Sequence, residues 1–368
     1  MEKNQWKNRK IAILSMQRIV NFGSVLQAYS LRELIREITG AKVTFLDIEY
    51  TPCLLSKKSV KKSVDYETPA AYPPGILQQA KRWCIARLSS WNKHLIRRFM
   101  ENELMLTEIE AAEQYDCVVI GSDEVFNHNN DVCLQLHGQV KQTEKVIAYA
   151  ASCGSAVASD IYPMDLDTVQ AAMAHFSAIS VRDKATEQYV SMLYEKKIER
   201  HLDPVLVGDL YRRKSRPVWL KKYLLVYAYG QRIRTAEEID AIRSFAKAKG
   251  LKTVAMGGSQ FWCDLYIPAS PFRLLDYFSH ADYVVTDTFH GTIFSIINRK
   301  KFAVIVRKTN SGKITGLLED MGLCDRLAVN MNQLEDILPQ EINYDAVESI
   351  LEQERIRTRE YLKRQMEG

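Results

Sequence analysis

The sequence predicts an α/β protein built from two Rossmann-like halves, each with a parallel β-sheet. Short runs rich in Val, Ile and Tyr alternate with longer segments in which apolar residues recur at helical spacing. This alternation occurs in two separate series along 368 residues, a length typical of two domains. A polar stretch that ends at Pro217 separates the two series.

The first series alternates β-rich runs with helical patterns, and Gly40 is placed to end its first helix. We expect strands at Lys10–Leu14, Lys42–Ile48, Asp116–Ile120, Lys145–Ala150 and Ala178–Val181, with helices at Phe22–Thr39, Leu77–Met100 and Lys184–Tyr194.

The second series repeats this alternation after Pro217. We expect strands at Tyr223–Tyr229, Leu251–Ala255, Tyr283–Thr286 and Phe302–Val306, with helices at Thr235–Lys249, Phe272–His280 and Gly291–Asn298. The charged tail from Tyr344 to Met366 carries apolar residues at helical spacing. The expected organisation is therefore a domain over residues 1–208, a second over 217–340, and an amphipathic helix over 341–368 that packs across the cleft between them.

Composition indicates an ordinary globular protein, with 46% hydrophobic and 26% charged residues. No apolar run approaches the roughly 20 residues needed to span a bilayer, and the polar N-terminus does not resemble a signal peptide. Seven cysteines without a C-x-x-C pair favour reduced thiols and no zinc site. We therefore expect a cytoplasmic protein that requires no metal.

A Phe-His-Gly segment at the start of a helix is the most informative motif. It follows the Val- and Tyr-rich strand that ends at Thr286, and its histidine is His290. The N-terminus of a helix attracts anions, and a histidine there can act as an acid or base beside a phosphate or carboxylate. The candidates for this role are His290, Thr288, Gly291 and Thr292. The alternative is that Thr286 or Thr288 only caps the helix and His290 packs at its start.

Cations at expected strand ends could bind the same anion. Arg182 follows the strand that ends at Val181, where ligands bind in doubly wound sheets. Arg307 and Lys308 follow the last strand of the second series. The alternatives are a surface pair between Arg182 and a nearby carboxylate, and a solvated strand exit for the other two.

Two further turns at strand ends carry polar residues. Asn21 and Gly23 lie where the first strand meets its helix, and Gly23 permits close approach of the backbone to a ligand. The Gly-Ser-Asp turn after Ile120 carries Asp123, with Glu124 and Asn127 close behind. Asp123 is a candidate to accept a proton from a sugar hydroxyl, with Glu124 and Asn127 orienting it. Capped turns explain both segments equally well.

The positive charge is concentrated between residues 57 and 100. Ten basic residues lie between Lys57 and Arg98 against two acidic ones, whereas the net charge of the whole chain is only +5. Leu77, Ala80, Cys84, Leu88, Trp91, Leu95 and Phe99 recur there at helical spacing. Tryptophans beside cations suit a helix on an anionic membrane surface, although the same pattern fits a helix docked on its own domain. Because the excess is local, we do not expect nucleic-acid binding.

Several segments together resemble the polysaccharide pyruvyl transferase family. They are Asn21 to Tyr29, Val119 to Asn127, Ile147 to Ser152, Ile179 to Asp183, Leu202 to Pro204, and Asp282 to Gly291. The resemblance implies a GT-B-like fold of two Rossmann domains that face a cleft. It also implies transfer of a pyruvyl group from phosphoenolpyruvate to a sugar, forming a cyclic ketal on a surface polysaccharide or its lipid-linked precursor.

On this resemblance, His290 is expected to be the general acid and base, and Arg182 to clamp phosphate or carboxylate. Phosphoenolpyruvate would be the donor substrate, with no further cofactor, and a nucleotide sugar or lipid-linked saccharide the acceptor. The first domain would hold the acceptor and the second the donor. Two departures stand out: better-studied members of the family carry an Arg where this chain has Thr288, and many have Gly-Asp where it has Gly23-Ser24.

Two other functions remain open at this stage. One is a GT-B glycosyltransferase using a nucleotide sugar, for which Met256 to Ser259 offers only a short phosphate loop. The other is a non-catalytic sugar-phosphate-binding protein, which the two departures from the family pattern would permit.

Overall fold

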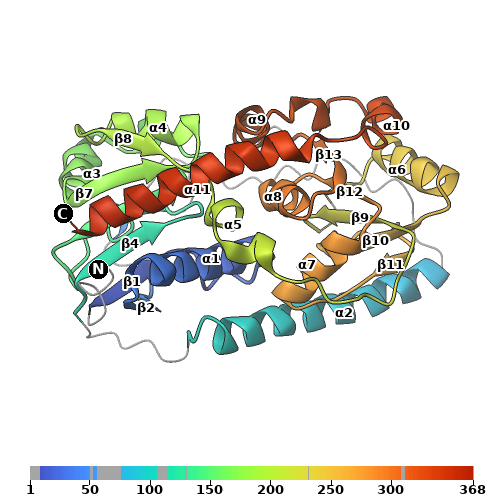
Figure 1. Ribbon diagram of the computed structural model, residues 1–368, viewed down its shortest axis with the longest axis horizontal. Helices are drawn as coiled ribbons and strands as arrows, with labels where there is room; N and C mark the ends of the chain where they lie inside the picture. Colours follow the sequence, from blue (N-terminus) through green and yellow to red (C-terminus); the bar gives the residue numbers. More distant parts are fainter. Residues whose placement is uncertain are drawn as a thin grey trace.

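The computed structural model describes residues 9–49, 53–55, 76–106, 114–128, 131–230, 232–307 and 311–367. Two six-stranded parallel sheets organise the chain, as the alternation predicts (Figure 1). The first sheet has the order β2-β1-β4-β6-β7-β8. Its strands are β1 (Lys10–Leu14), β2 (Lys42–Phe45), β4 (Cys117–Gly121), β6 (Val146–Ala151), β7 (Phe176–Val181) and β8 (Ile198–Arg200). This sheet and its helices form the N-terminal half.

The second sheet has the order β11-β10-β9-β12-β13-β14 and forms the C-terminal half with its helices. Its strands are β9 (Tyr223–Ala228), β10 (Lys252–Gly257), β11 (Leu265–Tyr266), β12 (Tyr283–Thr286), β13 (Lys301–Ile305) and β14 (Leu327–Ala328). The central strands β4, β6 and β9 are buried at every position, since helices cover both faces of such sheets. This double burial explains why they read as continuous apolar runs.

The helices follow the expected pattern with a few additions. They are α1 (Phe22–Thr39), α2 (Ile76–Asn102), α3 (Leu166–Met173), α4 (Lys184–Ser191), α5 (Pro204–Val207), α6 (Ala236–Ala248), α7 (Pro271–His280), α8 (Phe289–Ile297), α9 (Ser311–Asp320), α10 (Leu334–Ile337) and α11 (Tyr344–Glu367). A separate antiparallel pair joins β3 (Cys53–Leu55) to β5 (Asp131–Cys133).

The structure differs from the prediction mainly in short elements. The expected bounds of β1, α1 and β12 match those observed. Strands β8, β11 and β14 were not predicted because two or three residues carry no periodic signal. Helix α8 begins at Phe289, two residues before the expected start, so His290 lies inside its first turn.

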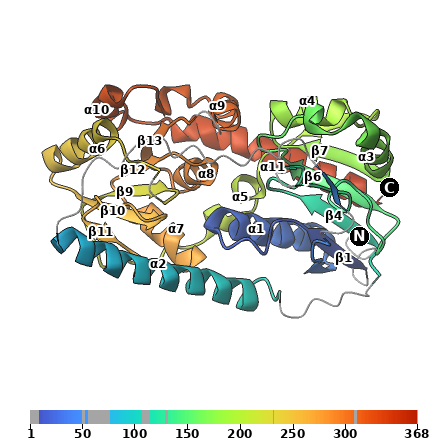
Figure 2. The same ribbon diagram turned by 180° about the vertical axis from the view of Figure 1, so that it is seen from behind.

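One apolar core joins the two halves. The same buried cluster contains Val25 of α1, Leu206 of α5, Phe294 of α8 and Leu362 of α11. Helix α11 starts beside the C-terminal half, where the Tyr344 hydroxyl donates to the Lys300 carbonyl at 2.6 Å. It ends beside the N-terminal half, and Figures 1 and 2 show it lying across both. The C-terminal helix therefore packs across the halves as expected.

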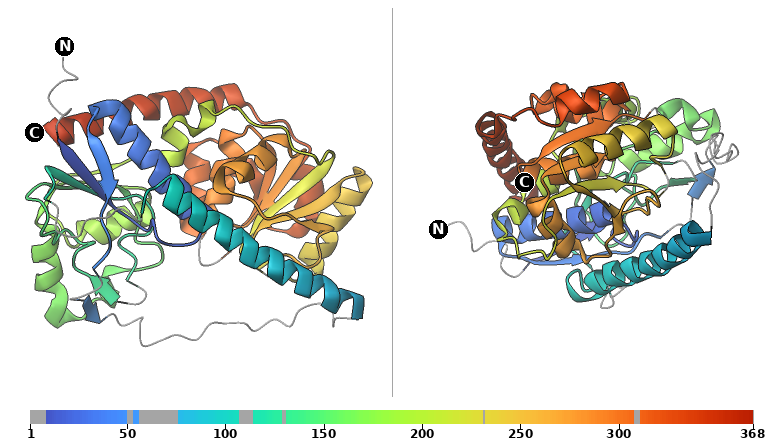
Figure 3. Two further views of the ribbon diagram at one scale, coloured as in Figure 1. Left: turned by 90° about the horizontal axis from the view of Figure 1, so that it is seen from below. Right: turned by 90° about the vertical axis from the view of Figure 1, so that its right-hand side faces the viewer.

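Helix α2, from the segment that we expected in the N-terminal domain, packs against both halves (Figure 3). Its Phe99 ring lies 5.9 Å from the ring of Tyr29 in α1, and further contacts join it to the C-terminal half. The Asn92 side chain accepts a hydrogen bond from the Ala269 amide at 3.0 Å, and Lys81 Nζ donates to the Cys263 carbonyl at 2.6 Å. With 27 residues, α2 is about 40 Å long, which is enough to extend from the N-terminal half over the C-terminal half. Residues 57 to 75, which contain four of the ten basic residues of the charged segment, lie outside the described residues.

Among the described residues, no helix is both long and apolar enough to cross a membrane.

Candidate active site

A cavity of 720 Å³ opens between the two halves, and we call it the large cavity. Most of the side chains that line it follow the carboxyl ends of strands in both sheets, where ligands bind in open α/β folds, and the β3–β5 pair adds Cys53, Asp131 and Cys133. The N-terminal half contributes Asn21, Ser24, Asp123, Glu124 and Arg182, and the C-terminal half contributes Tyr229, Arg232, Phe289, His290 and Lys313.

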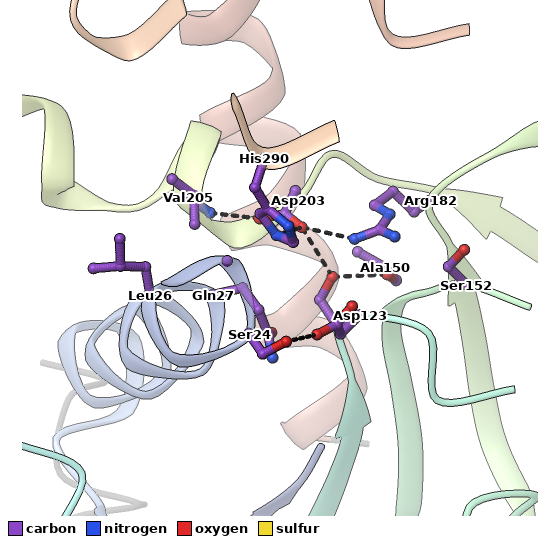
Figure 4. A network of polar contacts seen from close by, with 12 residues as sticks. Ser24, Leu26, Gln27, Asp123, Ala150, Ser152, Arg182, Asp203, Val205 and His290 are labelled. Atoms are coloured by element: carbon purple, nitrogen blue, oxygen red, sulfur yellow. Dashed lines mark hydrogen bonds and ion pairs between the residues drawn. The ribbon is translucent and has the colours of Figure 1, made fainter. Parts of the chain in front are cut away.

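His290 lies at the junction of the halves, held by the start of α8. Thr288 is the N-cap of this helix, and its hydroxyl accepts the Gly291 amide at 2.9 Å. This cap orients the first turn so that His290 points toward the N-terminal half. There its Nε2 lies 3.6 Å from Asp203 Oδ2, and 13% of its side chain remains exposed (Figure 4).

Asp203 is fully buried and is the centre of the polar network in Figure 4. Its Oδ2 accepts a hydrogen bond from Arg182 Nη1 at 2.9 Å, and its Oδ1 accepts the Val205 amide at 3.0 Å. Burial alone would raise the pKa of this carboxyl. The contact with His290, and then Arg182 and Val205, outweigh burial and lower the pKa to about 2. Asp203 is therefore a fixed negative charge beside the imidazole.

Arg182 is the cation of this network. Its guanidinium stacks 4.2 Å from the centre of the Phe289 ring and pairs with Asp203, with the side chain almost entirely buried. Burial disfavours the charged form, but the carboxylates of Asp203, Asp123, Asp183 and Glu124 prevail and raise the pKa. The guanidinium thus borders the large cavity in a fixed orientation.

Gly23 makes room for the imidazole. A Cβ at this position would lie 2.2 Å from His290 Nδ1 and 2.4 Å from Cγ, far inside van der Waals contact. Gly23 is in the first turn of α1, and the Asn21 side chain caps that turn by accepting the Gly23 amide at 2.7 Å. The expected role of Gly23 was close approach to a ligand, whereas the structure shows close approach to His290.

The turn after β4 holds the acidic residues. Asp123 adopts a left-handed backbone conformation with φ of 73°, and its Oδ2 accepts the Ser24 hydroxyl at 2.7 Å. Glu124 pairs with Lys313 of the other half and accepts Asn127 Nδ2 at 2.7 Å. Burial would raise the pKa of Glu124, but Lys313 and then Asn127 lower it. Lys313 therefore reaches across the large cavity.

A second cavity of 140 Å³, the small cavity, adjoins the first at His290, Asn21 and Tyr229. Its walls include Thr288 and Gly258 from the C-terminal half and Lys93 from α2. His290 thus contacts both cavities.

Several candidates from the sequence lie elsewhere. Gly291 and Thr292 are buried and line neither cavity, and the Thr292 hydroxyl donates to the Thr288 carbonyl at 3.0 Å. Arg307 pairs with Glu238 and with Asp287, the latter at 3.3 Å. Lys308 lies outside the described residues.

Sequence reasoning did not single out Arg232 and Lys313. Arg232 follows β9 and pairs with the buried Asp287 at 3.4 Å, while Lys313 is in the first turn of α9. Arg232 is close enough to the end of a predicted strand that the strand-end rule applied to Arg182 would have found it. Lys313 carried no signal, because α9 was not predicted.

Among the described residues, no three His, Cys, Asp or Glu side chains lie close enough together to hold a metal ion.

The family model for polysaccharide pyruvyl transferase matches residues 21–309, which contain the cavity residues of both sheets and His290. The chain belongs to the polysaccharide pyruvyl transferase family. A search of curated proteins finds no match.

Solved structures with a similar fold are GT-B proteins of low sequence identity. Arabidopsis thaliana UGT89C1 complexed with UDP-L-rhamnose is 11% identical with a TM-score of 0.50, and the match covers 98% of this chain and 99% of that one. The UDP co-structure of S. aureus MnaA is 12% identical with a TM-score of 0.47, and the match covers 97% and 90%. The pyruvyl transferase family member thus has a GT-B-like arrangement of two Rossmann-like halves.

Proposed function

We propose that this protein transfers the pyruvyl group of phosphoenolpyruvate to a sugar of a surface polysaccharide or its precursor, forming a cyclic ketal and releasing phosphate. The observation that carries this proposal is the Asp203–His290 pair beside Arg182 where both halves border the large cavity. Ligand cavities typically measure roughly 300 to 1,000 Å³, so 720 Å³ provides room for the donor and part of a saccharide.

The reaction needs one acid, one base and a site for two anionic groups. A proton adds to the methylene carbon of phosphoenolpyruvate while a sugar hydroxyl forms a bond to the adjacent carbon and loses its proton. A second hydroxyl then bonds to the same carbon. The bond between this carbon and the phosphate oxygen breaks, and the proton of the second hydroxyl leaves with phosphate. Phosphoenolpyruvate and a diol thus give a ketal and phosphate, with all atoms balanced.

His290 is suited to carry the protons in both steps. A histidine changes charge near neutral pH, so it can take a proton from a hydroxyl and deliver one to carbon. Asp203, ionised and 3.6 Å from Nε2, stabilises the imidazolium that forms in between. Asp123 lines the same cavity and is the candidate to receive a proton from the acceptor. Asn21, Glu124 and Asn127 line the large cavity, and we assign them to binding of the acceptor.

The cations for phosphate and carboxylate come from both halves. Arg182 presents a planar fork that matches either group. Thr288 stands where better-studied members of the family carry an arginine, and its hydroxyl is used as a helix cap. Arg232 and Lys313 line the large cavity from the same half, and we assign them the charge that Thr288 lacks. Lys313 would exchange Glu124 for the anionic donor.

Ligand-induced stabilisation tests the proposal before the acceptor is identified. We would measure the unfolding temperature with phosphoenolpyruvate, phosphate, pyruvate and a panel of nucleotide sugars. At 100 times its Kd, a ligand adds about 2.7 kcal/mol to the free energy of unfolding. We expect phosphoenolpyruvate to stabilise the wild-type protein, and its turnover with an acceptor, followed by phosphate release, to disappear in His290→Gln. His175→Gln, at an exposed site, is the matched control.

Stabilisation by nucleotide sugars alone would contradict the donor assignment. Competition with phosphoenolpyruvate would then separate a nucleotide-sugar donor from a nucleotide-sugar acceptor. Normal turnover by His290→Gln would contradict the role of this histidine.

A further inference from the structure

Helix α2 has two apolar faces, and the residues that the structure describes cover only one of them. Its covered face packs Ile85, Ile96 and Phe99 into the protein core. The opposite face exposes 62% of Trp83, 37% of Leu88 and 51% of Trp91. The apolar stripe read from the sequence is therefore divided: Cys84, Leu88 and Trp91 face outward, whereas Phe99 at its end is buried.

The exposed face is strongly basic. Helix α2 contains six Lys and Arg residues and one acidic residue, Glu101. Lys81 and Arg82 turn inward, toward the Cys263 carbonyl and the Phe261 ring. The other four are exposed, and none forms an ion pair with any residue that the structure describes; they are Arg87, Lys93, Arg97 and Arg98.

Aromatic and basic groups interleave along this face. The Arg87 guanidinium lies 4.9 Å from the centre of the Trp83 ring. Figures 1 and 2 show α2 along one edge of the molecule, with no labelled helix or strand on its outer side. We call the exposed Trp83, Arg87, Leu88, Trp91, Arg97 and Arg98 the outer face of α2.

We propose that the outer face of α2 docks on an anionic lipid bilayer. Tryptophan prefers the boundary between headgroups and acyl chains, and the flanking cations are attracted to anionic headgroups. A protein partner fits less well, since a stable interface buries about 800 Å² on each side and this face is a stripe on a single helix. The net positive charge selects an anionic surface over a neutral one.

Docking would place the candidate active site close to the headgroups. Ser89, Asn92 and Ile96, on the inner side of α2, line the small cavity together with His290. A helix with its side chains is about 10 Å across, so His290 would lie on the order of one helix diameter from the bilayer surface. If the proposed function holds, this position favours a lipid-linked saccharide as the acceptor.

Vesicle co-sedimentation tests the docking independently of catalysis. The full chain would be mixed with phosphatidylcholine vesicles and with vesicles that also contain phosphatidylglycerol. Ionic strengths of about 0.1 M and 1 M correspond to Debye lengths of about 10 Å and 3 Å. We expect binding only to the anionic vesicles, and only at the lower ionic strength.

Paired variants identify the surface. Each basic residue near an anionic membrane contributes about a factor of five to binding. Arg87→Gln, Arg97→Gln and Arg98→Gln together should therefore weaken binding about 100-fold, and Trp83→Ser with Trp91→Ser should also weaken it. Two controls should bind like wild type. The first removes the same amount of charge from other exposed sites, with Lys141→Gln, Lys221→Gln and Lys247→Gln together. The second is Trp219→Ser, which removes a tryptophan whose side chain is 69% exposed.

No sedimentation with anionic vesicles at low salt would overturn the proposal, as would equal losses in the α2 variants and their controls. Binding to a soluble polyanion but not to vesicles would also overturn it. Stabilisation by phosphoenolpyruvate, measured in the same variants, reports separately on the proposed function and should be unchanged.

Discussion

Replacing Gly23 with Ala tests whether His290 depends on the N-terminal half for its position. The added methyl group would lie 2.2 Å from Nδ1, and contact between such atoms requires about 3.5 Å. The ring or the first turn of α1 must therefore move by roughly 1 Å. Crowding of this kind costs about 1 to 3 kcal/mol of the free energy of unfolding.

The matched substitution is Gly316→Ala in α9, where a Cβ meets nothing within 4 Å. There the methyl group should stabilise the protein by about 0.5 to 1 kcal/mol, because alanine loses less backbone entropy than glycine in a helix. The same gain should appear for Gly23→Ala once the imidazole is removed by His290→Ala. Gly23→Ala should therefore lower the free energy of unfolding when His290 is present and raise it in the His290→Ala background. Gly316→Ala should raise it in both.

A double-mutant cycle measures this difference. Urea denaturation of wild type, both single variants and the double variant should give an interaction energy of about 1.5 to 4 kcal/mol between positions 23 and 290. In the otherwise wild-type chain, a displacement of about 1 Å should also reduce kcat/KM about 100-fold. If Gly23→Ala has the same effect with and without the imidazole, the proposed contact does not exist.

Four further predictions concern the charges at the site. Asp203→Asn should cost about 3 to 5 kcal/mol at neutral pH, because it leaves the Arg182 cation buried without its partner; urea denaturation would reveal a smaller loss if the pair is weak. Because the pKa of Asp203 is lowered to about 2, its stabilising contribution is complete above about pH 4 and is lost as the pH falls toward 2; wild type should lose stability over this range more steeply than Asp203→Asn. Arg182→Lys should retain the fold but raise the Kd for phosphoenolpyruvate, measured by thermal stabilisation, at least tenfold. An ammonium replaces neither the planar guanidinium fork nor its stacking on Phe289. An unchanged Kd would exclude a role of Arg182 in binding phosphate or carboxylate. Lys313→Gln should raise the pKa of Glu124 in an NMR titration and weaken phosphoenolpyruvate binding, whereas a raised pKa with unchanged binding would restrict Lys313 to a structural pair.

The sequence by itself determined the parallel α/β architecture and the local geometry of its turns. Strands such as β4, covered on both faces, require continuous apolar runs, so they are visible without any structure. The caps at Asn21 and Thr288 are local hydrogen bonds over two or three residues, and the sequence offered them as alternatives to ligand binding. His290 was found for the same reason, because it lies at a recognisable strand-to-helix junction.

Only the tertiary structure decided what His290 faces. Its partners Asp203 and Gly23 are 87 and 267 positions away in the chain, and no local pattern links them. Lys313 joined the site in the same way, from a helix that was not predicted. Helix α2 carries apolar residues on two faces, and which face is buried depends on the shape of the surface that receives it. The periodicity of apolar residues shows which of them share a helix face. Whether that face is buried depends also on the surface that the helix packs against.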